Sequence, residues 1–225
     1  MTIKDSLYRG WKKGLLLPGA LLLTFPLLAH NINYALSRSP PHEVVWYYLT
    51  LGFKHIIPEG FDHILFVAGL CLMSKNIKTI IWQATAFTVA HCITLLLSMK
   101  NLLVAPGAVV EPVIALSILF IAVENVILSE LKPWRIAIVF LFGLVHGMGF
   151  ASALNEIGLP PGKFIMSILS FNLGVELGQI SVIMAIFLLI ILPFRNKTYY
   201  KKLITAPLSI LIALIAAYWT IQRII

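Results

Sequence analysis

The chain has 225 residues, of which 60% are hydrophobic and 12% are charged, and its mean hydropathy is +0.94. This composition excludes an ordinary soluble domain and indicates a polytopic helical protein whose partner is the lipid bilayer. The net charge of +8 does not indicate nucleic-acid binding, because Lys and Arg lie in short clusters between apolar runs, a pattern that orients membrane helices. Only two cysteines occur, Cys71 and Cys92, and both lie inside apolar runs, which excludes a disulfide framework.

The chain divides into an amino-terminal unit, residues 1–43, and a helical membrane domain, residues 44–225. Basic residues within 1–14 precede the apolar stretch 15–29, as in the n- and h-regions of a secretory signal. Two prolines interrupt that stretch, so a cleaved signal and an uncleaved first spanning helix both remain open. Ser39-Pro40-Pro41 then predicts an extended linker.

The apolar segments predict an all-α transmembrane bundle with six spanning helices, or seven with the amino-terminal segment, plus one short helix. The short helix is Val44–Ile57, which has 14 residues and fits an interfacial or re-entrant segment better than a span. Pro58 and Gly60 separate it from the next segment. The spanning candidates are Phe61–Met73, Ile80–Met99, Ala108–Leu128, Ile136–Leu154, Phe164–Leu192 and Ile204–Ile221.

The distribution of Lys and Arg predicts the orientation of these helices. With the amino terminus inside, twelve of the 17 Lys and Arg residues fall on the inner side and five on the outer side. The inner side includes Arg135 and 195–202, whereas the outer side includes Arg223. The chain is therefore expected in the cell (inner) membrane as a multi-pass protein, with a cytoplasmic amino terminus if the first segment is uncleaved.

Ionisable side chains inside or at the ends of these apolar segments mark the candidate site. Such a group near the middle of a bilayer costs about 2.5–3.5 kcal/mol on insertion scales, which makes it a functional candidate. Three imidazoles with three carboxylates and no thiolate suit a divalent ion such as nickel, cobalt or zinc. The candidate metal ligands are His55, Asp62, His63, His91, Glu111, His146, Glu176 and Gln179.

The expected depths of these groups predict an entry path from the outer side. Asp62 and His63 lie in the first turns from the outer surface, and Glu111 begins its helix there. His91 lies about 10 Å deep, and Glu176 about 18 Å deep, near the middle of a bilayer core about 30 Å thick. The site is therefore expected to open outward and to end at the midplane.

Helical spacing also predicts which side chains share a face. Thr88 and Thr94 fall on the side of His91 and are expected to orient its imidazole. The small-residue pairs Gly143/Gly147 and Gly174/Gly178 predict that the His146 and Glu176 helices pack closely against each other. Glu124, beside Asn125 near the inner end of its helix, is interpreted as a structural polar group.

Five ordered motifs resemble the HupE/UreJ family of bacterial membrane proteins. They are His55-Ile-x-x-x-Gly60-x-Asp62-His63, Phe87-Thr-x-Ala-His91, Val110-Glu111-x-x-Ile-Ala-Leu-Ser117, Phe142-Gly-x-x-His146-Gly-x-Gly-Phe-Ala151 and Phe171-Asn-x-Gly-Val-Glu176-x-Gly-Gln179. Cys92 stands where Ser is expected in the family. Members of this family are accessory to nickel hydrogenases and ureases and are regarded as nickel or cobalt permeases. The resemblance therefore implies metal transport, with metalloenzyme maturation proteins as possible partners.

Three functions remain open at this level. The first is a transporter or facilitator that moves a divalent transition-metal ion inward, without a Walker-type ATP site of its own because no Gly-x-x-x-x-Gly-Lys-[Ser/Thr] loop occurs. The second is an intramembrane zinc-dependent enzyme such as a lipid hydrolase, in which three imidazoles leave a position for activated water. The third is a metal sensor or assembly partner that does not transport.

Overall fold

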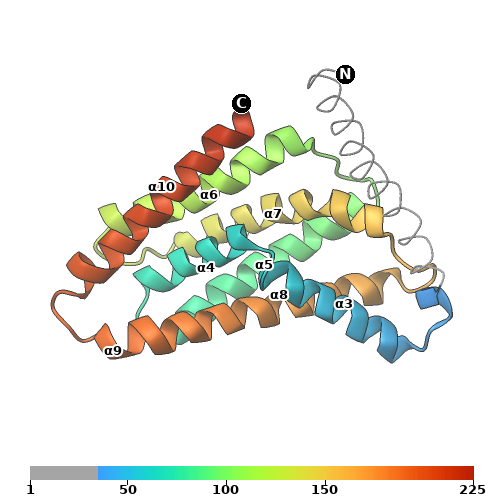
Figure 1. Ribbon diagram of the computed structural model, residues 1–225, viewed down its shortest axis with the longest axis horizontal. Coiled ribbons are helices and arrows are strands. Elements are labelled where there is room, and N and C mark those ends of the chain that lie inside the picture. Colours follow the sequence, from blue (N-terminus) through green and yellow to red (C-terminus); the bar gives the residue numbers. More distant parts are fainter. Residues whose placement is uncertain (1–34) are drawn as a thin grey trace, which may run out of the picture.

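The computed structural model describes residues 35–225, so the predicted signal-like or first spanning stretch lies outside the described residues. Throughout the described part the chain is helical and contains no strand, which confirms the predicted all-α class. The elements are α3 (Pro41–Ile56), α4 (Phe61–Met73), α5 (Ile77–Met99), α6 (Gly107–Ile127), α7 (Arg135–Ile157), α8 (Phe164–Ile186), the π-helical turn η1 (Phe187–Ile191), α9 (Leu192–Phe194), the π-helical turn η2 (Lys201–Thr205) and α10 (Ala206–Ile224) (Figure 1).

Five segments of the described chain are long and apolar enough to cross a membrane: α5, α6, α7, α8 with its continuation to Phe194, and η2 with α10. α4 has 13 residues, about 20 Å of helix, and is too short to cross a bilayer core about 30 Å thick by itself. α3 and α4 meet the length requirement only as a pair, and the two helices are bent by 69° at the break between them. Phe61–Met73, predicted as a separate spanning helix, is thus the second half of a broken spanning segment or of a re-entrant loop.

Three helix pairs organise the bundle: α3 lies along α8, α7 along α5, and α10 along α6, while α4 lies among them (Figure 1). Glycines allow the first two pairs to approach backbone to backbone. A Cβ atom at Gly52 would collide with the carbonyl oxygen of Phe171, and one at Gly147 would collide with the carbonyl oxygen of His91. Without a hydrophobic driving force between helices in lipid, such close packing supplies much of the attraction.

The small-residue pairs do not join the helices that their spacing predicted. Gly143 and Gly147 of α7 face Phe87 and His91 of α5, whereas Gly174 of α8 faces Leu49 of α3. The expectation that the His146 and Glu176 helices pack closely against each other was therefore wrong. Spacing identifies a face that can approach another helix, but not which helix it meets.

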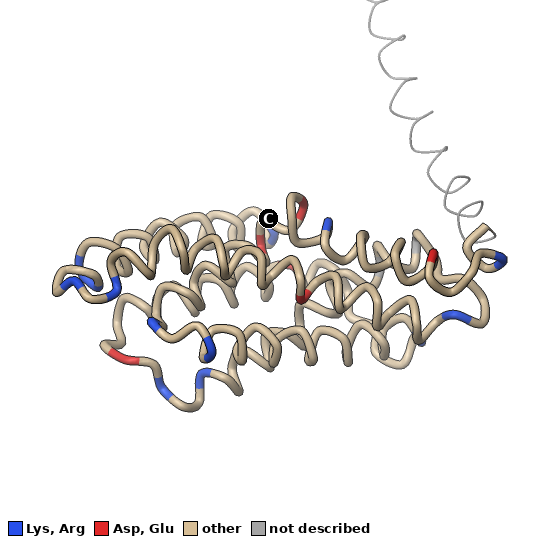
Figure 2. Tube along the Cα trace, turned by 90° about the horizontal axis from the view of Figure 1, so that it is seen from below, with Lys and Arg blue, Asp and Glu red and all other residues tan. Residues whose placement is uncertain are grey.

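The connections gather at two ends of the bundle. The end formed by residues 74–76, 128–134 and 195–200, together with the helix turns next to them, is called the basic end below and carries eight of the thirteen Lys and Arg residues of the described chain (Figure 2). The opposite end is formed by residues 100–106 and 158–163 and the carboxyl terminus. Because basic residues favour the cytoplasmic side, the basic end is expected to be cytoplasmic, and this orientation stays a prediction.

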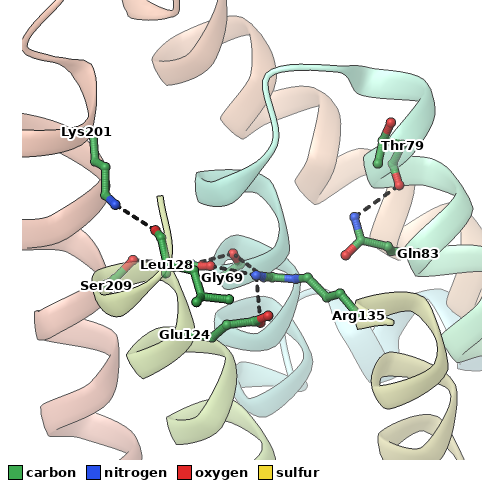
Figure 3. Close-up of polar contacts among 9 residues, drawn as sticks. Gly69, Thr79, Gln83, Glu124, Leu128, Arg135, Lys201 and Ser209 are labelled. Atoms are coloured by element: carbon green, nitrogen blue, oxygen red, sulfur yellow. Dashed lines mark hydrogen bonds and ion pairs between the residues drawn. The ribbon is translucent and has the colours of Figure 1, made fainter. Parts of the chain in front are cut away.

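One cation counted as a loop charge is in fact buried. Arg135 begins α7 with a fully buried side chain, and its Nη1 lies 2.8 Å from Oε2 of Glu124 (Figure 3). The same guanidinium donates to Asn125 Oδ1 at 3.0 Å and to the Gly69 carbonyl at 3.4 Å. The group therefore ties α7 to α6 and α4 rather than contributing a solvated positive charge.

Candidate metal centre

The break between α3 and α4 brings two histidines together. α3 ends at Ile56, Pro58 supplies no backbone donor to continue it, and α4 begins at Phe61. A Cβ atom at Gly60 would collide with the carbonyl oxygen of His55, so the tight return of the chain needs glycine there. As a result, His55 in the last turn of α3 and His63 in the first turn of α4 place their ring centroids 4.8 Å apart.

Two further imidazoles reach this point from α5 and α7. His91 has its ring centroid 6.0 Å from that of His63 and 6.3 Å from that of His55. The His146 ring lies 5.1 Å from that of His63. These four rings are called the histidine cluster below. Aromatic side chains pack against them: the ring centroid of Phe150 lies 4.0 Å from that of His55, and the ring centroid of Phe87 lies 4.9 Å from that of His146.

The hydrogen bonds of His91 determine which of its nitrogens carries the proton. Asn172 Nδ2 donates to the Ile168 carbonyl at 2.9 Å, so Asn172 presents its oxygen, Oδ1, to His91 Nδ1 at 3.1 Å. An amide oxygen only accepts, and therefore Nδ1 is the protonated nitrogen. Nε2 then carries a free lone pair, and this buried atom has no hydrogen-bond partner among the described residues.

The same reasoning applies to His146 with the two nitrogens exchanged. Ser117 Oγ donates its only hydrogen to the Ile114 carbonyl at 2.7 Å and lies 2.9 Å from His146 Nε2. His146 must therefore donate from Nε2, which leaves the lone pair on Nδ1. That atom is also buried without a partner among the described residues. A hydrogen bond that fixes the tautomer and holds the ring is what metal-binding imidazoles in proteins usually have.

Three imidazoles of the cluster are close enough to share one ion. Ligand nitrogens of His55, His63 and His91 all lie within 4.8 Å of one another, and Nε2 of each is buried without a partner among the described residues. Metal–imidazole bonds of about 2.0–2.1 Å place tetrahedral ligands roughly 3.4 Å apart, so the nitrogens would need to close by about 1.4 Å at most. His146, in contact with His63, is available as a fourth donor.

A cavity of about 530 Å³ lies beside the cluster and reaches the protein surface through the exposed residues Glu59 and Glu111. His55, His63 and His146 contribute to its wall, whereas His91 does not. Asp62 also lines the cavity, but its carboxylate accepts both of its resolved hydrogen bonds from Arg223 Nη2, at 2.9 and 3.1 Å. A cation entering this cavity would thus meet carboxylates before imidazoles.

The remaining predicted ligands, Glu176 and Gln179, lie apart from the three-histidine set, between α5 and α8. Thr85 Oγ1 donates to Glu176 Oε1 at 2.6 Å, and Thr88 Oγ1 lies 3.2 Å from Gln179 Oε1. Glu176 Oε2 and Gln179 Nε2 are buried without a partner among the described residues. Together with the His91–Asn172 contact, these pairs form a polar line along the α5–α8 interface.

Three details of the site differ from the sequence-based expectations. Thr88 and Thr94 do not orient His91, because each hydroxyl donates to a carbonyl one turn earlier on its own helix. Asn172 of α8 has that role instead. Arg223, counted only as an outer-side charge, proves to be the partner of Asp62. Its position in the last turn of an otherwise apolar helix was the available signal.

Comparison with known proteins adds the family. A family model described as HupE / UreJ protein matches residues 32–223, which is most of the chain. No curated protein matches the chain, and no solved structure matches it. The matched range includes every helix that contributes to the histidine cluster and its cavity. This multi-pass membrane protein with a buried cluster of histidines therefore belongs to the HupE/UreJ family.

Proposed function

We propose that the chain moves a divalent transition-metal ion, nickel or cobalt, across the membrane through the histidine cluster. The observation that carries this proposal is the set of buried ring nitrogens, near the break between α3 and α4, that have no hydrogen-bond partner among the described residues. Buried polar atoms in proteins are nearly always paired, and each unpaired one needs an explanation. Four of them converging from four helices are explained by a cation that binds there in transit.

The donor types support the choice of metal. Imidazole nitrogens next to carboxylates suit nickel, cobalt or zinc, whereas copper(I) prefers sulfur, and magnesium or calcium prefers an all-oxygen site. No cysteine or methionine lines the cavity in the described part of the chain. Zinc remains within the same donor class, so the family resemblance favours nickel and cobalt over it.

The broken helix supplies a further attraction for cations. The carboxyl end of α3 carries the negative end of a helix dipole, and it stops next to His55 within the bundle. Discontinuous helices whose ends face a substrate site are a common way for transporters to bind ions inside a membrane. Glu59, Asp62 and Glu111 would collect the cation at the cavity, and the polar line of Thr88, Gln179 and Glu176 would form the deeper part of its route.

In this scheme Arg223 competes with the metal ion for the Asp62 carboxylate. Its guanidinium occupies the Asp62 carboxylate and also donates to the Glu111 carbonyl at 3.2 Å. An arriving divalent ion gains access to the Asp62 oxygens only when the guanidinium moves aside. An inside-negative membrane potential supplies about 4.6 kcal/mol per 100 mV for a divalent ion, which is enough to drive inward movement without ATP.

Uptake by proteoliposomes tests the proposal directly. Vesicles that contain the purified full chain, with an imposed inside-negative potential, are expected to accumulate radiolabelled nickel or cobalt. His63→Ala and His146→Ala should abolish this uptake at equal protein content, whereas His42→Ala, at an exposed histidine of α3, should leave it unchanged. Full uptake by both cluster variants would overturn the proposal.

The zinc-enzyme alternative also has an observation in its favour. Three clustered imidazoles beside a cavity with carboxylates are the components of a catalytic zinc site, which uses three protein ligands and a carboxylate as general base. Purified protein separates the two functions. A single zinc ion that resists dialysis would favour the enzyme, and weakly held, exchangeable nickel or cobalt would favour transport.

A further inference from the structure

The basic end of the bundle contains a second cavity, of about 470 Å³, whose lining shares no residue with the cavity beside the histidine cluster. It is bounded by the end of α4, residue Ser129, and the stretch from Arg195 to Lys201 with Thr205. Four basic side chains line it, and no acidic side chain of the described residues does: Lys75, Arg195, Lys197 and Lys201. It is called the basic cavity below.

Charge accumulation alone would be explained by the orientation of membrane helices, but the basic cavity is more organised than that. Lys201 Nζ donates to the Leu128 carbonyl at 2.6 Å, and Lys75 Nζ lies 5.3 Å from the centre of the Tyr200 ring. Thr205 Oγ1 donates to the Leu72 carbonyl at 3.1 Å and thereby joins η2 to the end of α4. These contacts hold three separate chain segments around one space.

A buried hydroxyl without a hydrogen bond of normal geometry points to what the space binds. Tyr200 is 3% exposed and lines the basic cavity, and its Oη atom makes no hydrogen bond of normal geometry to the described residues, although the Thr205 hydroxyl lies near enough to lower its pKa. Burial has the larger effect and raises the pKa of this phenol, so the oxygen keeps its proton and can donate.

We propose that the basic cavity binds the phosphate group of an anionic phospholipid. Lys and Arg recognise a phosphate by charge-assisted hydrogen bonds, and Arg by paired ones. A lipid source is favoured over free phosphate because Leu192, Phe194 and Leu203, which lie close in the chain to lining residues of the cavity, are exposed apolar side chains. They offer acyl chains an apolar surface next to the charged site.

Thermal unfolding of the purified full chain in nanodiscs tests this. One set of nanodiscs contains phosphatidylcholine alone, and the other adds phosphatidylglycerol in a ratio of about three to one. The wild type is expected to unfold at a higher temperature with phosphatidylglycerol. The double variant Arg195→Gln/Lys197→Gln should lose this increase and bind phosphatidylglycerol roughly tenfold or more weakly, since each basic group near a surface contributes on the order of 1 kcal/mol.

The matched control is Lys78→Gln/Lys202→Gln, which removes the same charge at the same end from exposed residues that do not line the basic cavity. It should keep the phosphatidylglycerol effect. Equal loss in both double variants would show that only the surface charge matters and would overturn the proposal, as would an absent effect in the wild type. Tyr200→Phe, which removes a single oxygen, should reduce the effect without unfolding the protein.

A separate arm adds inorganic phosphate to the phosphatidylcholine nanodiscs. We expect no stabilisation there, because the free ion lacks the acyl chains that anchor the headgroup. Stabilisation by inorganic phosphate with none by phosphatidylglycerol would overturn the lipid as the source of the phosphate group. Native mass spectrometry should show more phosphatidylglycerol retained by the wild type than by Arg195→Gln/Lys197→Gln, and equal retention would count against the proposal.

Discussion

Two buried polar regions of the bundle differ in whether their polar groups have partners within the chain. In one, the Glu124 carboxylate lies 2.8 Å from the Arg135 guanidinium, and that cation also binds Asn125 and the Gly69 carbonyl (Figure 3). In the other, the histidine cluster gathers four imidazoles, each with a buried nitrogen that has no partner among the described residues. A buried charge that pairs with an opposite charge of the same chain joins the helices that carry the two groups. Several buried imidazoles without partners can instead bind a cation from outside the protein.

The largest effect is expected when the compensated pair is broken. Arg135→Met leaves the Glu124 carboxylate buried and unpaired, which should lower the free energy of unfolding by about 3–5 kcal/mol. The double variant Glu124→Gln/Arg135→Met removes both charges and should recover much of that loss. Unfolding in detergent micelles measures both effects.

The control for this prediction is Lys132→Met, which breaks the exposed pair with Glu130. In that pair Lys132 holds the pKa of Glu130 below its ordinary value, but the groups are solvated and stability should stay near wild type. If Arg135→Met were as harmless as Lys132→Met, the buried pair would not be structural.

The open region should respond in the reverse way. His63→Ala removes an imidazole whose Nε2 has no partner among the described residues, so it should lower nickel affinity by at least about a hundredfold while changing stability little. Isothermal titration with nickel and thermal unfolding of the same preparation measure the two quantities. Lost stability with retained affinity would assign the cluster to the same structural class as Glu124.

A smaller effect is expected from the group that fixes a tautomer. Asn172→Leu should lower nickel affinity by about 10–100-fold, because His91 Nδ1 loses the acceptor that holds the ring. Thr94→Val is the matched control on α5, since that hydroxyl donates to backbone carbonyls and not to the imidazole. Equal losses in the two variants would contradict the assignment of Asn172 as the group that positions His91.

The smallest effect concerns the ion pair at the cavity. Arg223→Gln frees the Asp62 carboxylate and should raise nickel uptake at low metal concentration by about fivefold or less, as befits a partly exposed pair. Lys100→Gln, at the same end of the bundle, should have no such effect. A fall in uptake in Arg223→Gln would show that the guanidinium assists the metal rather than competing with it.

Sequence patterns predicted the bounds of single helices and the residues of the candidate site, but they did not predict which side chains contact each other between helices. The apolar runs predicted the bounds of α5 to α10 nearly correctly. The motifs also predicted that His63, His91 and His146 belong to one site. Both predictions were possible because insertion cost and helical geometry are local properties. His91 shows the limit. Thr88 and Thr94, on the same helix, were predicted to orient the His91 ring. Each hydroxyl instead donates to the backbone carbonyl four residues earlier, as Thr hydroxyls on helices commonly do.

The partners that matter are distant in the sequence. Asn172 is 81 residues from His91, and Arg223 is 161 residues from Asp62. Their meeting depends on how far each helix is shifted along its neighbour, which depends on close contacts such as those of Gly147 with α5. The metal-binding roles of all eight candidate ligands stay predictions; Glu111 lines the cavity beside the cluster, whereas Glu176 and Gln179 lie apart from it at the α5–α8 interface.

The break between α3 and α4 makes the site depend on chain length as much as on chemistry. An added or deleted residue between Ile56 and Phe61 would change the path of the tight return, in which a Cβ atom at Gly60 would already collide with the His55 carbonyl, and so would move the start of α4. His63 would then leave the other imidazoles, although hydropathy, motif residues and net charge would be almost unchanged. The four-residue spacer thus sets the position of His63 relative to His55, and one residue inserted there is expected to disrupt the cluster without replacing any candidate ligand.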